Sequence, residues 1–350
     1  MKRIILTGGG TAGHVTPNIA LLPRLKKLGY DIHYIGSYTG IEKELIEQFE
    51  IPYHGISSGK LRRYFSMQNF TDPFRVLKGF REAKELKPDI IFSKGGFVSV
   101  PVVMAGKRRH VPTIIHESDM TPGLANKISI PSATKVCCNF PETLEHLPKE
   151  KAVLTGSPIR QELLEGSKTA ALEFCDLTDD KPVILIIGGS LGSVVVNNAI
   201  RSILPELLKD FHVIHLCGKG KMDDSLKSLK GYVQFEYIQN QLKDLFALTD
   251  IVISRAGANA ICELLALRKP NLLVPLSANA SRGDQILNAR SFEHQGFSVV
   301  LEEEDLSKDT LLNSIYKLYQ HKNTYINAMK HSSQQDSINT IIKLIEEAAH

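Results

Sequence analysis

The sequence lacks the features that would place it among membrane-spanning, secreted or nucleic-acid-binding proteins. No apolar run in its 350 residues approaches the length that crosses a bilayer. The amino terminus passes from Met1 almost directly into a short strand pattern and glycines, without the apolar core of a signal peptide. The net charge of +4 is small, so it does not indicate a nucleic-acid partner. We therefore expect a cytoplasmic protein that binds no nucleic acid.

The cysteines lack the spacing of a metal or redox site. None of the five belongs to a C-x-x-C pair. Cys137 and Cys138 are neighbours, so they point to opposite faces if residues 135–140 form a strand. We expect buried thiols at all five positions, Cys137, Cys138, Cys175, Cys217 and Cys262.

The chain contains two similar halves. With 43% hydrophobic and 23% charged residues, its composition is that of a globular protein, and its length favours two domains. The first half opens with a strand pattern at 3–6, a glycine-rich turn at Gly8–Gly13 and a helix pattern at 19–25. The second half repeats this order with 182–187, Gly188–Ser193 and a helix pattern at 195–204. We expect one domain from each half.

A second internal repeat supports the same division. Residues 88–96 and 249–257 both read as a strand that ends in serine, a basic residue and small residues. Strand patterns alternate with helix-length segments throughout, which indicates parallel sheets. The sequence therefore predicts two doubly wound α/β domains, residues 1–160 and 161–336. Residues 337–350 form an amphipathic helix that we expect to pack back on the first domain, with its apolar side made by Ile338, Ile341, Ile342 and Ile345.

The glycine-rich turn at Gly8–Gly13 matches the dinucleotide fingerprint G-x-G-x-x-G. An NAD site would also need an acidic residue at the end of the second strand to bind the ribose. That strand ends in Gly36 and Ser37 instead, which disfavours a dehydrogenase. A tight structural turn and a site for another phosphate stay open. Ligands of such sheets bind beyond the carboxyl ends of the strands, so we expect the site at the crevice between the domains.

Several short motifs occur together and in order along the chain. They are Gly9-Gly-Thr-Ala-Gly-His-Val15, Gly95-Gly-Phe-Val-Ser-Val-Pro101, Ile115-His-Glu117, Pro122-Gly-Leu-Ala-Asn126, Gly156-Ser-Pro-Ile-Arg160, Gly188-Gly-Ser-Leu-Gly192 and Ser254-Arg-Ala-Gly-Ala-Asn-Ala-Ile-Cys-Glu263. In this combination the chain resembles the bacterial peptidoglycan glycosyltransferases known as the MurG family. The resemblance covers nearly the whole chain.

The resemblance implies a fold, a reaction and partners. The fold would be GT-B, with two Rossmann-like domains facing a cleft. The reaction would be inverting transfer of N-acetylglucosamine from UDP-N-acetylglucosamine to lipid I, the undecaprenyl-diphosphate-linked muramoyl pentapeptide, which gives lipid II. The amino-terminal domain would bind this acceptor and the carboxyl-terminal domain the UDP-sugar. No metal and no cofactor are expected, and other cell-wall synthesis proteins are possible partners.

The resemblance also implies the residues of the donor site. Those that match in this sequence are Thr11, Ala12, Gly13, Arg160, Ser190, Ile238, Ala258, Asn259, Ala260, Ile261, Cys262, Glu263 and Gln285. Two positions depart from the family pattern: Ala12 stands where glycine is frequent, and Asp119 where asparagine is frequent. The extra methyl at Ala12 is tolerable at negative φ. Asp119 is kept as a candidate donor residue, although a carboxylate cannot donate a hydrogen bond to the sugar.

The chemistry of the donor explains these residue types. A helix amino terminus opened by Gly257 offers N–H donors and positive partial charge to a diphosphate. Glu263, six residues further on, can face the same side and accept hydrogen bonds from both ribose hydroxyls. Arg160 can pair with the diphosphate and offset the charge of the leaving group.

Sugar transfer also needs a base that takes the proton of the attacking hydroxyl. His14 precedes a helix pattern, where the helix dipole disfavours the charged imidazole and keeps its pKa at or below the usual value. His116 and Glu117, which follow a strand pattern, form the competing base or the partner that orients it. The sequence does not separate these alternatives.

The acceptor brings a second diphosphate and a membrane. We expect Gly9 and Gly10, together with Gly95 and Gly96, to bind the acceptor diphosphate. Residues 60–67 mix cations with apolar side chains, as segments at membrane interfaces do. We therefore expect the enzyme at the cytoplasmic face of the membrane as a peripheral protein that contacts an anionic surface. A transferase with a soluble acceptor and a noncatalytic nucleotide-sugar-binding protein are the alternative interpretations.

Overall fold

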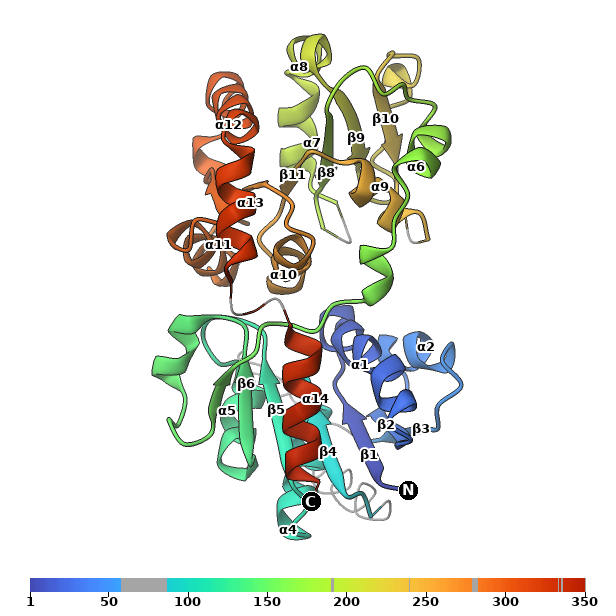
Figure 1. Cartoon of the computed structure of the whole chain (residues 1–350), viewed down its shortest axis with the longest axis vertical. Helices are drawn as coiled ribbons and strands as arrows, with labels where there is room; N and C mark the ends of the chain where they lie inside the picture. The colour runs from blue at the N-terminus through green and yellow to red at the C-terminus, as the bar shows by residue number, and fades with distance from the viewer. Residues whose placement is uncertain are drawn as a thin grey trace, which may run out of the picture. The chain divides into compact units, whose positions relative to one another are not determined.

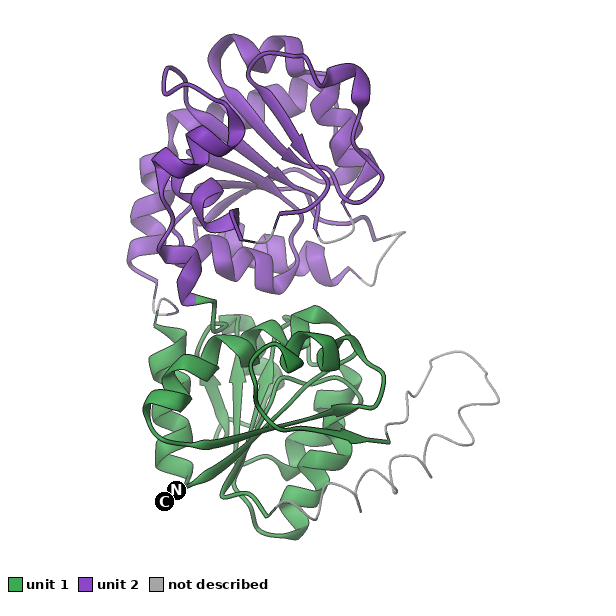
Figure 2. Cartoon of the chain, turned by 90° about the vertical axis from the view of Figure 1, so that its right-hand side faces the viewer, with its two compact units in different colours: residues 1–160, 336–350 green, residues 161–335 purple. Residues whose placement is uncertain are grey.

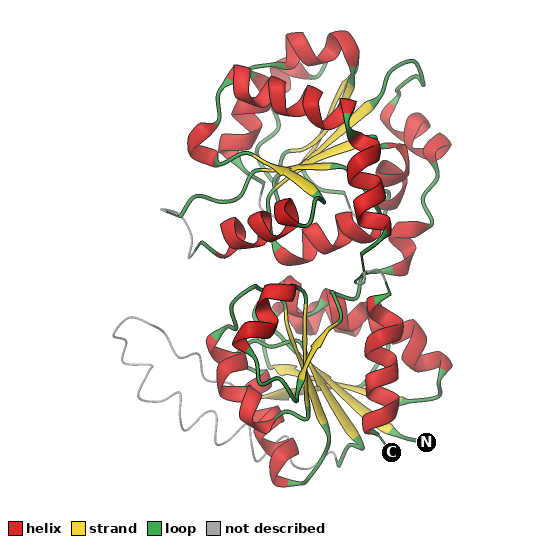
Figure 3. Cartoon of the chain, turned by 60° about the vertical axis from the view of Figure 1, so that its left-hand side comes forward, coloured by secondary structure: helices red, strands yellow, loops and turns green. Residues whose placement is uncertain are grey.

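The computed structural model of the chain describes residues 1–57, 87–189, 192–238, 240–278, 283–332, 334 and 336–349. It divides into two compact units, residues 1–160 with 336–350 and residues 161–335 (Figure 2). Both termini therefore belong to unit 1. Each unit is a parallel sheet with helices on its two faces (Figure 3).

The described part of unit 1 contains a seven-stranded parallel sheet of order β3-β2-β1-β4-β5-β6-β7 (Figure 1). Its strands are β1 (Arg3–Thr7), β2 (Asp31–Ser37), β3 (Tyr53–Ile56), β4 (Ile90–Ser93), β5 (Thr113–Glu117), β6 (Lys135–Cys138) and β7 (Ala152–Leu154). Its α-helices are α1 (Thr16–Lys27), α2 (Ile41–Glu47), α4 (Ser99–Arg108), α5 (Leu124–Ser129) and α14 (Ser337–Ala348), and its 3₁₀ helices are η1 (Ala12–His14), η3 (Ile130–Ser132) and η4 (Pro141–His146).

Alternation along the strands of unit 1 builds one core on each face of the sheet. Ile4 and Leu6 of β1 pack with α1 and α14 on one face, while Ile5 packs with α4 on the other. Cys137 and Cys138 divide in the same way between the two faces. All five cysteines are buried and free, as the sequence predicts.

The described part of unit 2 contains a six-stranded parallel sheet of order β10-β9-β8-β11-β12-β13. Its strands are β8 (Val183–Ile187), β9 (His212–Leu216), β10 (Tyr232–Phe235), β11 (Ile251–Ser254), β12 (Asn271–Leu273) and β13 (Ser298–Val300). Its α-helices are α6 (Lys168–Cys175), α7 (Val194–Arg201), α8 (Leu204–Asp210), α9 (Leu242–Leu248), α10 (Ala258–Ala266), α11 (Asp284–His294), α12 (Lys308–Gln320) and α13 (Lys322–Lys330). Its 3₁₀ helices are η5 (Gln161–Leu164), η6 (Asp224–Leu226) and η7 (Glu303–Asp305).

The prediction of a single helix at 195–204 is wrong, because the structure has two helices there. The structure ends α7 at Arg201 and starts α8 at Leu204. Pro205 lies in the first turn of α8, where the missing proline N–H has no intrahelical partner to lose; inside one continuous helix it would remove a hydrogen bond. The rest of the predicted α/β alternation and the parallel pairing are confirmed.

Both units place their central glycine turns at equivalent points. The chain order of the strands reverses between β1 and β4 in unit 1 and between β8 and β11 in unit 2. The turns after these four strands therefore lie at the positions where open α/β sheets bind ligands.

Candidate active site

The carboxyl edge of the unit 1 sheet brings three predicted segments together. β1, β4 and β5 are neighbours and end at Thr7, Ser93 and Glu117. The glycine turn after β1 and the turn after β4 are in direct contact, because a side chain at Gly96 would collide with the backbone oxygen of Gly9. Gly95 and Gly96 both have positive φ, +89° and +83°, a conformation that other residues rarely adopt.

His14 lies at the end of η1, half-buried, with one ring nitrogen fixed by the turn. Its Nδ1 is 3.0 Å from the carbonyl oxygen of Gly9 and 3.2 Å from Oγ1 of Thr11. Because a carbonyl oxygen only accepts, Nδ1 carries the proton and Nε2 carries the lone pair. Among the described residues, Nε2 has no hydrogen-bond partner. This is the tautomer that a proton acceptor at Nε2 requires.

The pKa of His14 is lowered, as the sequence predicts, but for a different reason. Burial is the main cause, and the charge of Lys94 adds to it, against the raising effects of the Gly9 carbonyl and Glu42. The helix α1 begins at Thr16, so His14 is not part of its first turn. His14 is therefore neutral near pH 7.

His116 is fully buried and has both ring nitrogens occupied. Lys94 donates from Nζ to Nδ1 of His116 at 2.7 Å and also to Oγ of Ser118 at 2.7 Å. Nε2 of His116 donates to the carbonyl oxygen of Gly156 at 2.8 Å. Burial, followed by the charge of Lys94, holds the pKa of His116 well below its usual value. With no lone pair left for a substrate proton, His116 does not fit the role of base in this arrangement.

Glu117 is also committed to internal contacts. Its carboxylate accepts hydrogen bonds from the backbone N–H groups of Asp119 and Gly123 and from Nδ2 of Asn126, at 2.9, 3.0 and 2.8 Å. Burial raises the pKa of this carboxyl, against the effect of these hydrogen bonds. Glu117 thus shapes the loop after β5, in which Asp119 lies half-buried, and a contact of Asp119 with the sugar stays a prediction.

Sequence reasoning missed Glu42, whose carboxylate occupies the glycine turn. Its Oε2 accepts from the N–H of Gly10 at 3.1 Å, and its Oε1 accepts from N and Oγ of Ser37 at 3.0 and 2.5 Å. An amide has one hydrogen to donate, and Glu42 accepts it from Gly10 in this arrangement, so a contact of Gly10 with the acceptor diphosphate stays a prediction. Binding of the acceptor diphosphate by Gly9, Gly95 and Gly96 also stays a prediction. Nothing in the local sequence around Glu42 distinguishes it from a surface acid.

In unit 2 the predicted donor residues lie near the carboxyl edge of the sheet. Gly257 precedes α10 and has open space around its Cα. Ala258, Asn259, Ala260, Ile261, Cys262 and Glu263 form the first turns of α10, with the side chains of Ile261 and Cys262 buried and that of Glu263 half-buried. Ile238 follows β10, and Oε1 of Gln285 accepts from the N–H of Leu276 at 3.1 Å. Ser190 lies outside the described residues.

Arg255 braces the glycine turn of unit 2 from the end of β11. Its guanidinium donates to Oγ of Ser193 at 2.7 Å and to the carbonyl oxygens of Val274 and Pro275. It also pairs with Glu303. Lys94 of unit 1 occupies the matching position after β4. The sequence similarity between 88–96 and 249–257 therefore corresponds to a buried cation that packs against the glycine turn of each unit. Arg160, the last residue of the first segment of unit 1, is half-buried.

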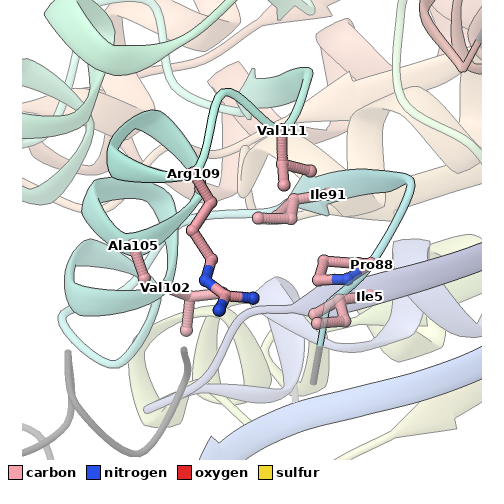
Figure 4. Close-up of a pocket in the computed structure, with 8 residues that line it drawn as sticks. Ile5, Pro88, Ile91, Val102, Ala105, Arg109 and Val111 are labelled. Atoms are coloured by element: carbon pink, nitrogen blue, oxygen red, sulfur yellow. The ribbon is translucent and has the colours of Figure 1, made fainter. Parts of the chain in front are cut away.

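A small apolar pocket lies at the other end of the unit 1 strands (Figure 4). It is lined by Ile5, Pro88, Ile91, Val102, Ala105, Gly106, Arg109 and Val111. Its volume of about 10 Å³ has room for about one water molecule. Pro88 and Val111 precede β4 and β5, so the pocket is not at the edge that carries His14.

Neither a membrane-spanning helix nor a metal cluster is found in the described segments. No helix there is long and apolar enough to cross a bilayer. No group of three or more histidine, cysteine, aspartate or glutamate residues in the same segments has the geometry to hold a metal ion. Metal-independent activity stays a prediction. It rests on the assignment of the donor diphosphate to the amino terminus of α10 and to Arg160, and it is tested below.

Comparison with known proteins gives the family. The pattern of the glycosyltransferase family 28 N-terminal domain matches residues 4–138, and that of the family 28 C-terminal domain matches residues 183–345. Relatives from Lachnospira eligens and Lachnoclostridium phytofermentans are 70% and 67% identical, each over 99% of both chains. Both are named UDP-N-acetylglucosamine--N-acetylmuramyl-(pentapeptide) pyrophosphoryl-undecaprenol N-acetylglucosamine transferase. The fold is similar to the crystal structure of Acinetobacter baumannii MurG, with 25% identity, a TM-score of 0.77 and coverage of 99% of this chain and 100% of that one.

Proposed function

Because the chain belongs to glycosyltransferase family 28, we propose that it transfers N-acetylglucosamine from UDP-N-acetylglucosamine to the undecaprenyl-diphosphate-linked N-acetylmuramoyl pentapeptide, converting lipid I to lipid II. The observation that carries this proposal is the 70% identity, over 99% of the chain, to a relative named for this transfer. Unit 1 binds the acceptor and unit 2 binds the donor. His14 is the catalytic residue that takes the proton.

The transfer is a single displacement. The acceptor hydroxyl attacks C1 of the donor sugar, the bond between C1 and the diphosphate oxygen breaks, and UDP leaves with the electron pair. The proton of the hydroxyl moves to Nε2 of His14, whose lone pair the turn keeps available. Configuration at C1 inverts. Arg160 and the amino terminus of α10 offset the charge that develops on the diphosphate.

The test of the function is transfer of labelled N-acetylglucosamine to two acceptors in buffer with a strong chelator. We expect product with a lipid I analogue and little with a soluble muramoyl pentapeptide that lacks the lipid diphosphate, because the glycine turns of unit 1 are proposed to bind that diphosphate. Equal transfer to the soluble compound would favour a soluble acceptor, and donor binding without any turnover would favour a binding protein. Activity that returns only with magnesium or manganese would contradict metal-independent transfer.

Glu263 is proposed to bind the ribose of the donor. Glu263→Ala should weaken binding of UDP-N-acetylglucosamine by about 1–3 kcal/mol, the range for losing hydrogen bonds to a charged group. Isothermal titration with the donor and its 2′-deoxyribose analogue checks the contact. Wild type should discriminate between the two donors and the variant should not. Equal discrimination by both proteins would remove Glu263 from the ribose.

The acceptor lies in a membrane, and we propose that unit 1 contacts the anionic cytoplasmic surface as a peripheral protein. Residues 60–67, predicted for this contact, lie outside the described residues. A described surface supports the proposal: α4 and α5 pack together and expose Met104, Leu124 and Ile128. Lys107 is exposed one turn from Met104, and Lys127 is exposed one turn from Leu124. Cations around apolar side chains favour an anionic lipid surface.

Leu124→Ser with Ile128→Ser should reduce binding to phosphatidylglycerol vesicles several-fold, because the variant loses the apolar part of the contact while the cations remain. Flotation with vesicles measures this binding. The matched control is Leu164→Ser with Leu229→Ser, which changes two exposed leucines of unit 2. Equal binding by wild type and both variants would remove α5 from the membrane contact.

A further inference from the structure

The peptide group between Gly9 and Gly10 joins two functional side chains. Its N–H donates to Oε2 of Glu42 at 3.1 Å, and its carbonyl oxygen accepts from Nδ1 of His14 at 3.0 Å. Glu42 and His14 are thus the two ends of one hydrogen-bonded chain. The mechanism above uses His14 and leaves the buried carboxylate of Glu42 without a role.

Three glycines make room for this carboxylate. A methyl group at Gly9 would come within 2.6 Å of the Glu42 side chain, one at Gly36 within 2.7 Å, and one at Gly40 closer still. None of the three has positive φ, so the backbone conformation does not require glycine at these positions. The room for a side chain is limited instead by Glu42 at Gly9 and Gly40, and at Gly36 by Glu42 together with the hydroxyl of Tyr53, which lies closer still. Gly9 belongs to the turn after β1, Gly36 to β2 and Gly40 to the start of α2, so three segments close around one side chain.

The carboxylate is ionised in this cradle. Burial alone raises the pKa of Glu42, but the hydrogen bonds from Ser37, from its own N–H and from Gly10 outweigh burial and leave the pKa below its usual value. The residue is completely shielded from solvent. A buried negative charge with fixed N–H donors on it is a strong acceptor.

A peptide that donates to a strong acceptor becomes a better acceptor at its own carbonyl oxygen, because hydrogen bonds in a chain polarise one another. The Gly9 carbonyl therefore binds the Nδ1 proton of His14 more firmly when Glu42 is charged. A carboxylate placed directly on a catalytic imidazole fixes its tautomer and stabilises its protonated form. Here one peptide group stands between the carboxylate and the imidazole.

We propose that Glu42 is the positioning residue of His14 and acts through the Gly9–Gly10 peptide, fixing the tautomer and strengthening Nε2 as proton acceptor. This inference rests on the proposed role of His14 in the transfer. The charged groups that act on His14 are Glu42, from α2, and Lys94, from the end of β4. Lys94 lowers the pKa of His14 and Glu42 raises it, so removing the charge of Glu42 should lower that pKa further.

Glu42→Gln tests the proposal. We expect kcat to fall roughly 10- to 100-fold, the range seen when the hydrogen-bond partner of a metal-ligating histidine is removed, with donor KM nearly unchanged. The acid limb of the kcat profile should move to lower pH, because the neutral amide no longer favours protonated His14. Glu47→Gln is the matched control, since it neutralises an exposed carboxylate on the same helix, and it should leave kcat and the limb unchanged.

Glu42→Asp keeps the charge but shortens the side chain, so it separates charge from contact and serves if the glutamine variant does not fold. Its acid limb should stay near that of wild type while kcat falls. ¹⁵N NMR of the His14 ring gives a readout that does not depend on turnover. In wild type it should show Nδ1 protonated, and in Glu42→Gln a lower pKa and a mixed tautomer.

An unchanged His14 pKa and tautomer in Glu42→Gln would overturn the proposal. If instead the ring responds to Glu42 but the kinetic limb never follows the His14 pKa, even in wild type, then the coupling holds and the role of His14 as base fails. The two failures are therefore distinguishable.

Discussion

His14→Ala is expected to lower kcat by roughly 10²–10⁴-fold, the usual contribution of a positioned general base, with a much smaller change in donor KM. Of the two candidate histidines, His14 is half-buried and keeps the lone pair of Nε2 available, whereas both ring nitrogens of the buried His116 are occupied. The His14→Ala variant therefore loses the available proton acceptor. Steady-state kinetics with a lipid I analogue measures the effect.

The pH profile makes this prediction sharper. In wild type, activity should fall as pH drops through the pKa of His14, because the protonated ring cannot accept a proton. Burial holds that pKa below the usual imidazole value, so the limb should lie below about pH 6.5. His14→Gln keeps a polar side chain and should lose the limb. If glutamine restores kcat and the limb persists, His14 positions a substrate and another group is the base.

Ile341→Ala is expected to destabilise unit 1 by about 2–5 kcal/mol, the range for truncating a buried isoleucine. Ile341 of α14 is completely buried in the core that α14 shares with α1 and the sheet of unit 1. A loss of this size is a large fraction of the stability of an ordinary domain. Hydrogen exchange read by mass spectrometry localises the effect, and the amides of β1 and β4 should exchange faster.

Lys343→Ala on the same helix is the matched control. Its side chain is 78% exposed, so its effect should stay within about 0.5 kcal/mol. Affinity for UDP-N-acetylglucosamine should survive in Ile341→Ala, because the donor is assigned to unit 2. Equal exchange in the two variants would mean that α14 does not contribute to the stability of unit 1.

The fold could be predicted to a large extent because its signals are local. Apolar runs such as 183–187 read directly as buried parallel strands, and Ile338, Ile341, Ile342 and Ile345 recur at helical spacing, which predicted the buried side of α14. The break between α7 and α8 was missed because residues 195–204 read as one helix pattern, and Pro205, which marks the start of α8, lies just beyond it.

The site could be predicted only in part, because its chemistry depends on contacts between distant segments. The motif pointed to His14, but whether His14 or His116 has an available lone pair is decided by Gly9 and Lys94, which the sequence does not place. Glu42 lies 32 residues from Gly10 in the chain, and no short pattern links them. Gly10 was therefore assigned to a phosphate, although its N–H binds an internal carboxylate.

The anomeric configuration of the product tests the central claim most directly. UDP-N-acetylglucosamine has an α-linked sugar, and a single displacement assisted by His14 inverts C1. The coupling between H1 and H2 of the transferred sugar, measured by NMR on product made from a lipid I analogue, should therefore show a β linkage. An α linkage, or no sugar on the lipid-linked acceptor, would contradict the proposed transfer.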